Sequence, residues 1–120
     1  MNKILIIDDD PDFSNLLKAL LVYGGYQVEV VNDPKQGIVA AREKTPGLIL
    51  LDALMPEMNG IEVLEALQRD EAGRNIPVIL LTGKTSGDDH AIERKAGAVA
   101  CLLKPVDSKK LLETIKQILP

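Results

Sequence analysis

The sequence predicts a single α/β domain of three layers (αβα), in which a doubly wound, open parallel sheet of (βα)5 type lies between two layers of helices. Five short apolar runs alternate with five segments of helical periodicity along the chain. Three of the runs are unbroken stretches of Ile, Leu and Val, which is typical of strands covered by helices on both faces. A length of 120 residues is enough for one such core and too short for two.

The five expected strands are short and rich in branched aliphatic residues. They cover residues 4–7, 28–31, 48–51, 78–81 and 99–103. The second differs from the others because Gln27-Val28-Glu29-Val30 alternates polar and apolar residues, so we expect it at an edge of the sheet. Right-handed crossovers between successive parallel strands then place helices on both faces.

The helices are predicted from apolar spacing and from start and stop signals. The first has an apolar stripe formed by Phe13, Leu16, Leu17, Leu20 and Leu21. Asp10-Pro11 supplies its N-cap and first-turn proline, and Gly24-Gly25 ends it. The later helices are expected after Asp33-Pro34, after Gly60, over 88–95, and around Leu111, Leu112, Ile115, Ile118 and Leu119.

Composition and charge exclude several classes of function. The net charge is −4 and aromatic residues make up 2% of the chain, which argues against direct nucleic-acid binding. No apolar run approaches the roughly 20 residues of a membrane span, and no secretory signal is recognisable. The single cysteine, Cys101, excludes an intramolecular disulfide and fits a reducing compartment, so we expect a cytoplasmic protein.

Polar residues follow four of the five expected strands. The first strand is followed by Asp8-Asp9-Asp10, the third by Asp52, the fourth by Thr82 and the fifth by Lys104-Pro105. Only Asn32, after the expected edge strand, is undistinguished. The carboxyl ends of parallel strands meet at one edge, where doubly wound sheets bind their ligands. We therefore expect three acids, a hydroxyl and an ammonium group to converge there.

The chemistry expected at this edge follows from charge. Two like charges ~4 Å apart near a protein surface repel by about 4 kcal/mol at an effective dielectric of 20, so Asp8, Asp9 and Asp52 need either protons or a cation. Oxygen ligands favour Mg²⁺, which readily shares its shell with phosphate. Lys104 and Thr82 would then bind phosphoryl oxygens, and Asp52 is the candidate nucleophile for an aspartyl phosphate.

Four motifs in order carry a resemblance to a known family. They are Ile4-Leu5-Ile6-Ile7-Asp8-Asp9, Leu50-Leu51-Asp52-Ala53-Leu54-Met55-Pro56-Glu57-Met58-Asn59-Gly60, Leu81-Thr82-Gly83 and Leu103-Lys104-Pro105. Over essentially its whole length, the chain resembles a response-regulator receiver domain of two-component signalling. The resemblance implies a flavodoxin-like fold with strand order 2-1-3-4-5, and a single receiver domain over 1–120 with no output domain in this chain.

The resemblance also implies a role for each matching residue. Asp52 is the phosphoacceptor, Asp9 a direct Mg²⁺ ligand, and Asp8 a metal residue that acts mainly through water. Leu54 offers its backbone carbonyl to the metal. Thr82 and Lys104 contact the phosphoryl oxygens, and the Lys104–Pro105 peptide bond is cis.

The function implied is a phosphorylation-dependent signalling switch that is not an enzyme, although it supports its own phosphoryl transfer and autodephosphorylation. A histidine kinase or phosphotransfer protein donates the phosphoryl group to Asp52. The surface around the fourth helix, fifth strand and fifth helix then controls a downstream protein or a linked output domain. We expect a monomer or a weak homodimer with no nucleic-acid or membrane partner.

Two positions depart from the usual pattern of the family. Cys101 stands where Tyr or Phe is common, and Val106 stands where Phe often follows the proline. We expect phosphorylation to survive these changes and the transmission of the signal to differ. Lys84 and Leu54 occupy the positions at which the family tunes the access of water to the phosphate.

Two other functions compete with the switch. A haloacid-dehalogenase-like phosphohydrolase would use the same residue types, but it needs a second Asp two residues after the nucleophile, where this chain has Leu54. A phosphate-independent interaction module would keep the fold without the chemistry. The intact Asp52, Thr82 and Lys104 argue against that module, and Cys101 argues weakly for it.

Overall fold

The computed structural model describes residues 3–83 and 95–119 and contains one parallel sheet of five strands in the order β2-β1-β3-β4-β5. The strands are β1 (Lys3–Ile7), β2 (Gln27–Val31), β3 (Leu48–Asp52), β4 (Val78–Thr82) and β5 (Ala100–Leu103). The predicted strand order and the edge position of the second strand are confirmed. β5 begins one residue later than predicted, at Ala100, and Val99 before it is exposed.

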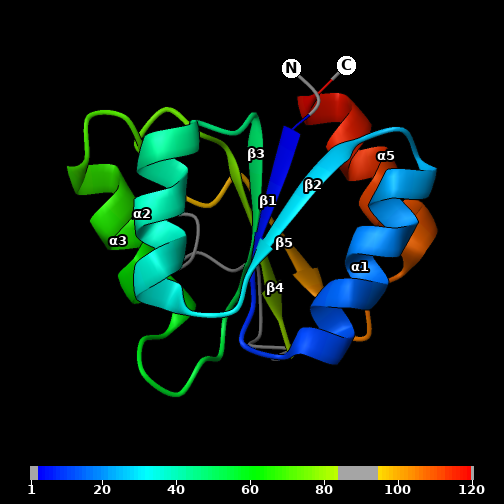
Figure 1. Cartoon of the computed structure of the whole chain (residues 1–120), viewed down its shortest axis with the longest axis horizontal. Helices are drawn as coiled ribbons and strands as arrows, with labels where there is room; N and C mark the ends of the chain where they lie inside the picture. The colour runs from blue at the N-terminus through cyan, green and yellow to red at the C-terminus, as the bar shows by residue number, and fades with distance from the viewer. Residues whose placement is uncertain (1–2, 84–94, 120) are drawn as a thin grey trace.

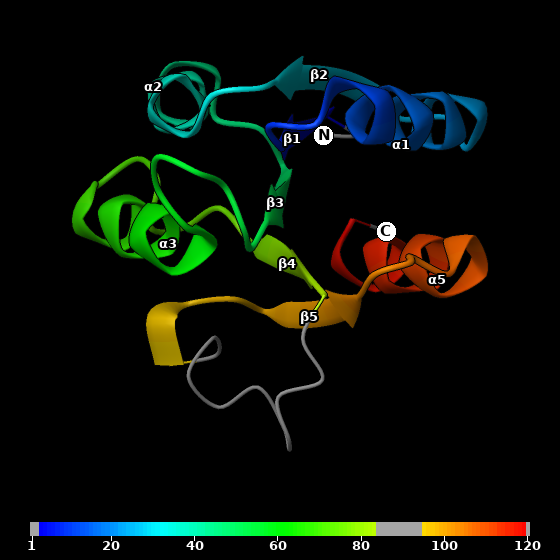
Figure 2. The same cartoon turned by 90° about the horizontal axis from the view of Figure 1, so that it is seen from below.

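Helices cover both faces of this sheet. They are α1 (Pro11–Tyr23), α2 (Pro34–Lys44), α3 (Gly60–Arg69) and α5 (Ser108–Ile118). α1 and α5 lie on one face, and α2 and α3 lie on the other (Figures 1 and 2). The helix predicted over 88–95 lies outside the described residues, apart from its last position.

Two apolar layers form the core, one on each face of the sheet. Alternate residues of a strand belong to different layers: Leu5 and Ile7 of β1 pack on the side of α2 and α3, whereas Ile4 and Ile6 pack on the side of α1 and α5. Every residue of β3 and β4 is buried, while β2 is only half-buried. The doubly apolar runs of the sequence are therefore the inner strands, as expected for a covered parallel sheet.

The four helices of the described ranges begin at side-chain caps. Asp10, Asp33, Asn59 and Asp107 each accept hydrogen bonds from backbone N–H groups of the first turn. Asn59 also forms a reciprocal capping box with Glu62, so α3 begins at Gly60 itself. The start signals predicted at Asp10-Pro11 and Asp33-Pro34 are confirmed.

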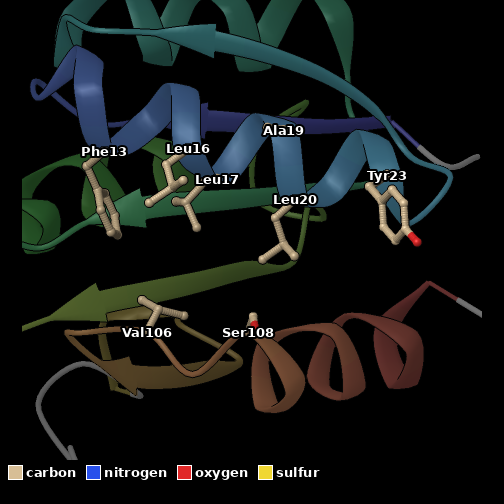
Figure 3. A pocket seen from close by; sticks show the side chains of 8 residues that line it. All are labelled: Phe13, Leu16, Leu17, Ala19, Leu20, Tyr23, Val106 and Ser108. Carbon is tan, nitrogen blue, oxygen red and sulfur yellow. The ribbon is translucent and has the colours of Figure 1, made fainter.

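The apolar stripe predicted on α1 is only partly buried. Leu17 and Leu21 are in the core and Phe13 and Leu20 pack at its margin, but Leu16 is 70% exposed. Leu16 instead lines an apolar groove of about 450 Å³ between α1 and the start of α5 (Figure 3). The spacing of the stripe identified a face wider than the one that the sheet and α5 cover. None of the helices in residues 3–83 and 95–119 combines the length and the apolarity needed to traverse a bilayer.

Candidate functional site

Strand register brings the predicted site residues to the carboxyl edge of the sheet. Asp52 pairs with Leu81 of β4, and Thr82, the next residue of β4, pairs with Leu103 of β5. Lys104 follows directly, and its backbone N–H donates to the carbonyl of Thr82 over 2.8 Å. Adjacent strands thus deliver a carboxylate, a hydroxyl and an ammonium group side by side.

Asp52 is 5% exposed, and one of its oxygens has two donors. Oδ1 accepts a hydrogen bond from Nζ of Lys104 over 2.9 Å and a longer one from the backbone N–H of Leu54 over 3.3 Å. A charge-assisted contact of this length is among the stronger hydrogen bonds in proteins. Asp52 and Lys104 therefore form a direct ion pair across the site.

Lys104 also lies close to two residues at the junction of β1 and α1. Its Nζ lies 3.7 Å from Oδ2 of Asp8 and 4.6 Å from the centroid of the Phe13 ring. The aromatic face attracts the ammonium group, so Phe13 at the start of α1 helps to hold it in place. The Lys104–Pro105 peptide bond is cis, as the resemblance implied.

The three acids of the site form one cluster. One oxygen each from Asp8, Asp9 and Asp52 can be chosen so that all three lie within 4.8 Å of one another. Asp9 is half-buried, whereas Asp8 is 1% exposed. The pKa of Asp8 is raised to about 6, chiefly by burial and also by the negative charges of Asp52 and Asp9, while the N–H of Asp10 and the charge of Lys104 oppose the rise.

The acidic cluster fits a hard divalent cation. Within the part of the chain that the structure describes, Oδ2 of Asp8 is buried without a hydrogen-bond partner. A buried carboxylate oxygen without a hydrogen bond is costly, and a cation bound by the three acids would give this oxygen a partner. Oxygen atoms from carboxylates are the ligands that Mg²⁺ prefers. The carbonyl of Leu54 as a further ligand stays a prediction.

The loop between β3 and α3 needs a glycine at its end. The N–H of Gly60 donates to the carbonyl of Ala53 over 2.9 Å, which closes the loop that follows Asp52. A Cβ atom at residue 60 would lie 2.9 Å from both the carbonyl oxygen of Asp52 and the Cα of Ala53, and 2.8 Å from Leu80. Backbone atoms cannot yield at such distances, so Gly60 lets the loop return close to the site.

Three residues that were not predicted from the sequence support the site, namely Asn32, Ser14 and Phe13. Asn32, regarded as undistinguished, donates through Nδ2 to the carbonyl of Asp8 over 2.7 Å and to Oγ of Ser14 over 3.2 Å. Phe13, regarded as a core residue, contacts Lys104. The position of Asn32 after a strand was a usable signal, because the other four strands all end in site residues.

The remaining predicted positions are placed as follows. Thr82 is 2% exposed at the end of β4, and its contact with a phosphoryl group stays a prediction. Cys101 is half-buried in β5, and Val106 packs at the margin of the core between α1 and α5. Lys84 lies outside the described residues.

Comparisons with known proteins agree with this geometry. Residues 4–116 match the family model of the response regulator receiver domain. The protein PilH of Pseudomonas aeruginosa is 37% identical over 119 residues, which cover 99% of this chain and 98% of PilH. The DNA-binding response regulator MtrA of Mycolicibacterium smegmatis is 35% identical over 114 residues, which cover 95% of this chain and 49% of MtrA. The chain thus spans nearly all of PilH but about half the length of MtrA.

A solved structure shares both the fold and the arrangement of the chain. The receiver domain of the sensor histidine kinase PA1611 from Pseudomonas aeruginosa PAO1 was solved with a magnesium ion coordinated in its active site cleft. It matches with a TM-score of 0.88 and 28% identity, over 99% of this chain and 98% of that one.

Proposed function

We propose, from the premise that this chain belongs to the family of response regulator receiver domains of two-component systems, that it is a switch controlled by phosphorylation of Asp52. The donor would be a histidine kinase or a phosphotransfer protein. The observation that carries the proposal is the ion pair of 2.9 Å between Asp52 and Lys104, beside two further acids at the same sheet edge. The roles of Asp8, Asp9, Leu54, Thr82 and Lys104 belong to this proposal.

The proposed step transfers a phosphoryl group between two side chains. A carboxylate oxygen of Asp52 forms a bond to phosphorus, and the bond between phosphorus and the donor's histidine nitrogen breaks. The electron pair of the broken bond stays on that nitrogen, and because the other ring nitrogen carries a proton, the histidine leaves as a neutral imidazole. Asp52 loses its negative charge in this step, so Lys104 is drawn toward the more highly charged phosphoryl oxygens.

Asp8, Asp9 and Asp52 would hold Mg²⁺, together with the carbonyl of Leu54. When bound, the ion supplies positive charge that offsets the repulsion between the acids and the incoming phosphoryl group. The magnesium ion in the cleft of the PA1611 receiver domain supports this assignment. The hydroxyl of Thr82 and the ammonium group of Lys104 would bind the other phosphoryl oxygens.

The change at the site would reach the surface through β5. Lys104 directly follows β5, and its N–H bonds to Thr82 of β4, so movement of either side chain acts on this end of the strand. We propose that the altered surface around residues 88–95, β5 and α5 binds a downstream protein or a linked output domain. This chain covers 98% of the length of PilH, which fits a receiver that acts on a separate protein. It covers 49% of the length of MtrA, which fits a receiver linked to a further domain.

The proposal is tested with a small phosphodonor. The protein is incubated with acetyl phosphate and Mg²⁺, and its intact mass is measured. We expect one added phosphoryl group, which is absent in Asp52→Asn and absent with a chelator. The matched control is Asp70→Asn, which changes an aspartate at the far end of α3 and should leave uptake intact.

Two results would contradict the switch. No uptake from any donor would favour a phosphate-independent interaction module. Continuous turnover of phosphate esters would favour a phosphohydrolase of the haloacid-dehalogenase type.

A further inference from the structure

The loop between β1 and α1 begins where the backbone hydrogen bonds between β1 and β2 end. The N–H of Asp8 donates to the carbonyl of Val31 over 3.2 Å, and this is the last backbone bond from β2 to that loop. β2 ends at Val31, and Asp33 caps α2. In a parallel ladder the carbonyl of Asp8 would next accept from the N–H two residues beyond Val31. Its donor in this structure is instead the side-chain amide of Asn32, at 2.7 Å.

The same amide continues into the first turn of α1. Nδ2 of Asn32 lies 3.2 Å from Oγ of Ser14, a residue with no exposed surface. The Ser14 hydroxyl is within donating distance of the carbonyls of Asp10 (2.9 Å) and Pro11 (3.2 Å). Asn32 and Ser14 therefore connect both ends of the loop that carries Asp9.

We propose that Asn32 and Ser14 are positioning residues, which fix the backbone of residues 8–10 so that the carboxylates of Asp8 and Asp9 face Asp52 before a cation binds. The inference rests on the proposed function. Neither residue touches the reacting atoms; both act through the loop.

The physical reason is repulsion within the acidic cluster. Three carboxylates that can approach within 4.8 Å would move apart if their backbone allowed it. The loop has one internal restraint, the bond from the N–H of Asp10 to Oδ1 of Asp8 at 2.9 Å, and the Asn32 amide adds an external one. Groups that orient metal ligands from behind typically change metal affinity by about 10- to 100-fold when they are removed.

The experiment uses Asn32→Ala, Ser14→Ala and the double variant, with Gln27→Ala as the matched control. Asn32 is exposed, so its truncation opens no core cavity. Gln27 is also exposed and stands at the opposite end of the same strand. Amide hydrogen exchange of Asp9 and Asp10 is measured by NMR in chelator, the Mg²⁺ dissociation constant by calorimetry, and phosphoryl uptake by mass at increasing Mg²⁺.

We expect Asn32→Ala to accelerate exchange in the metal-free protein and to raise the Mg²⁺ dissociation constant about 10-fold. Uptake at saturating Mg²⁺ should stay within about twofold of the wild type, because the reacting groups are intact. Ser14→Ala should have a smaller effect, since the bond from Asn32 to Asp8 remains. The double variant should lose no more Mg²⁺ binding free energy than the two single variants lose together, because both residues act on one loop.

Unchanged exchange and unchanged Mg²⁺ affinity in Asn32→Ala would overturn the inference, even if the variant were less stable in chelator, because only a structural role would then remain. A wild-type protein that binds no Mg²⁺ would instead contradict the proposed function. The exchange rates in metal-free protein would still decide whether Asn32 holds the loop.

Discussion

The two ends of the sheet hold aspartates in opposite electrostatic situations. At the carboxyl end, burial beside two other acids raises the pKa of Asp8 to about 6. At the other end, where α3 leads toward β4, Asp70 accepts hydrogen bonds from the N–H groups of Ala72 and Gly73 and pairs with Arg42 of α2, and these contacts lower its pKa. The folded protein therefore favours the charged form of Asp70 at the amino end and disfavours the charged form of Asp8 at the carboxyl end.

This difference separates stability from proposed function in space. A carboxylate with a raised pKa disfavours the folded state at neutral pH, whereas one with a lowered pKa favours it. Substitutions at the carboxyl end should therefore impair ligand binding without lowering stability. Substitutions that remove a favourable contact at the amino end should lower stability without affecting the site.

The largest effect that we expect is a gain in stability from Asp8→Asn in chelator at about pH 7. Each pH unit between the usual value of 3.8 and about 6 corresponds to about 1.4 kcal/mol, so the free energy of unfolding should rise by about 2 to 3 kcal/mol. Urea unfolding followed by circular dichroism measures it.

The pH dependence of Asp8→Asn provides the control. Folded Asp8 keeps its proton up to about pH 6, whereas the unfolded chain releases it near 3.8, so this group's effect on wild-type stability worsens as the pH rises between these values. Asp8→Asn lacks this pH dependence, so wild type and variant should be about equally stable near pH 3.8, the usual pKa of the carboxyl group. A variant that is less stable at every pH would contradict the comparison.

Magnesium should remove the disadvantage of the carboxyl end. A ligand present at about 100 times its dissociation constant raises the free energy of unfolding by about 2.7 kcal/mol, if it binds the folded state alone. We expect this gain in the wild type and in Asp70→Asn, and a much smaller one in Asp9→Asn. Thermal unfolding with and without Mg²⁺ measures it, and equal gains in all three proteins would show that Asp9 is not a ligand.

Asp70→Asn should lower the free energy of unfolding, by less than the gains expected above. The amide oxygen can still accept from the N–H of Ala72, but the ion pair with Arg42 is lost. Because the pKa of Asp70 is lowered, its contribution is present above the usual carboxyl range and disappears as the pH falls below it. Urea unfolding of wild type and variant should differ near neutral pH, and the difference should shrink as the pH falls below the usual carboxyl range; a difference that stays constant would implicate packing instead.

The smallest effect should come from Thr45→Gly at the amino end. Thr45 ends α2 with φ of 41°, in the left-handed region that a β-branched side chain disfavours. Glycine removes that strain but gains entropy in the unfolded chain, so we expect a net stabilisation of a few tenths to about 1 kcal/mol. Calorimetry would detect it as a higher melting temperature, with Mg²⁺ binding unchanged. A lower melting temperature would mean that the Thr45 side chain contributes more than its backbone strain costs.

Sequence reasoning worked best where a local rule determines the structure. Alternating runs identified the strands to within one residue, and Asp10-Pro11 and Asp33-Pro34 marked the true helix starts. The meeting of Asp52 with Lys104 followed from the geometry of parallel strands, because their carboxyl ends share one edge.

It failed where the outcome depends on contacts between distant segments. Leu16 has the spacing of a core residue, but how far α5 extends over α1 is not encoded in that spacing. Asn32 has the composition of any loop residue, and its amide reaches Asp8 only because β2 stops one residue earlier. The rise in the pKa of Asp8 similarly depends on burial, which the run of three aspartates does not reveal.

The ion pair between Asp52 and Lys104 joins residues 52 positions apart, and its cation follows the last strand. During synthesis, a ribosome must therefore have released almost the entire domain before the acceptor meets its ammonium partner. A nascent chain, or one clipped before β5, would carry all three acids and lack Lys104. If Asp52 is the phosphoacceptor as proposed, such an incomplete molecule would lack the ammonium group proposed to bind the phosphoryl oxygens.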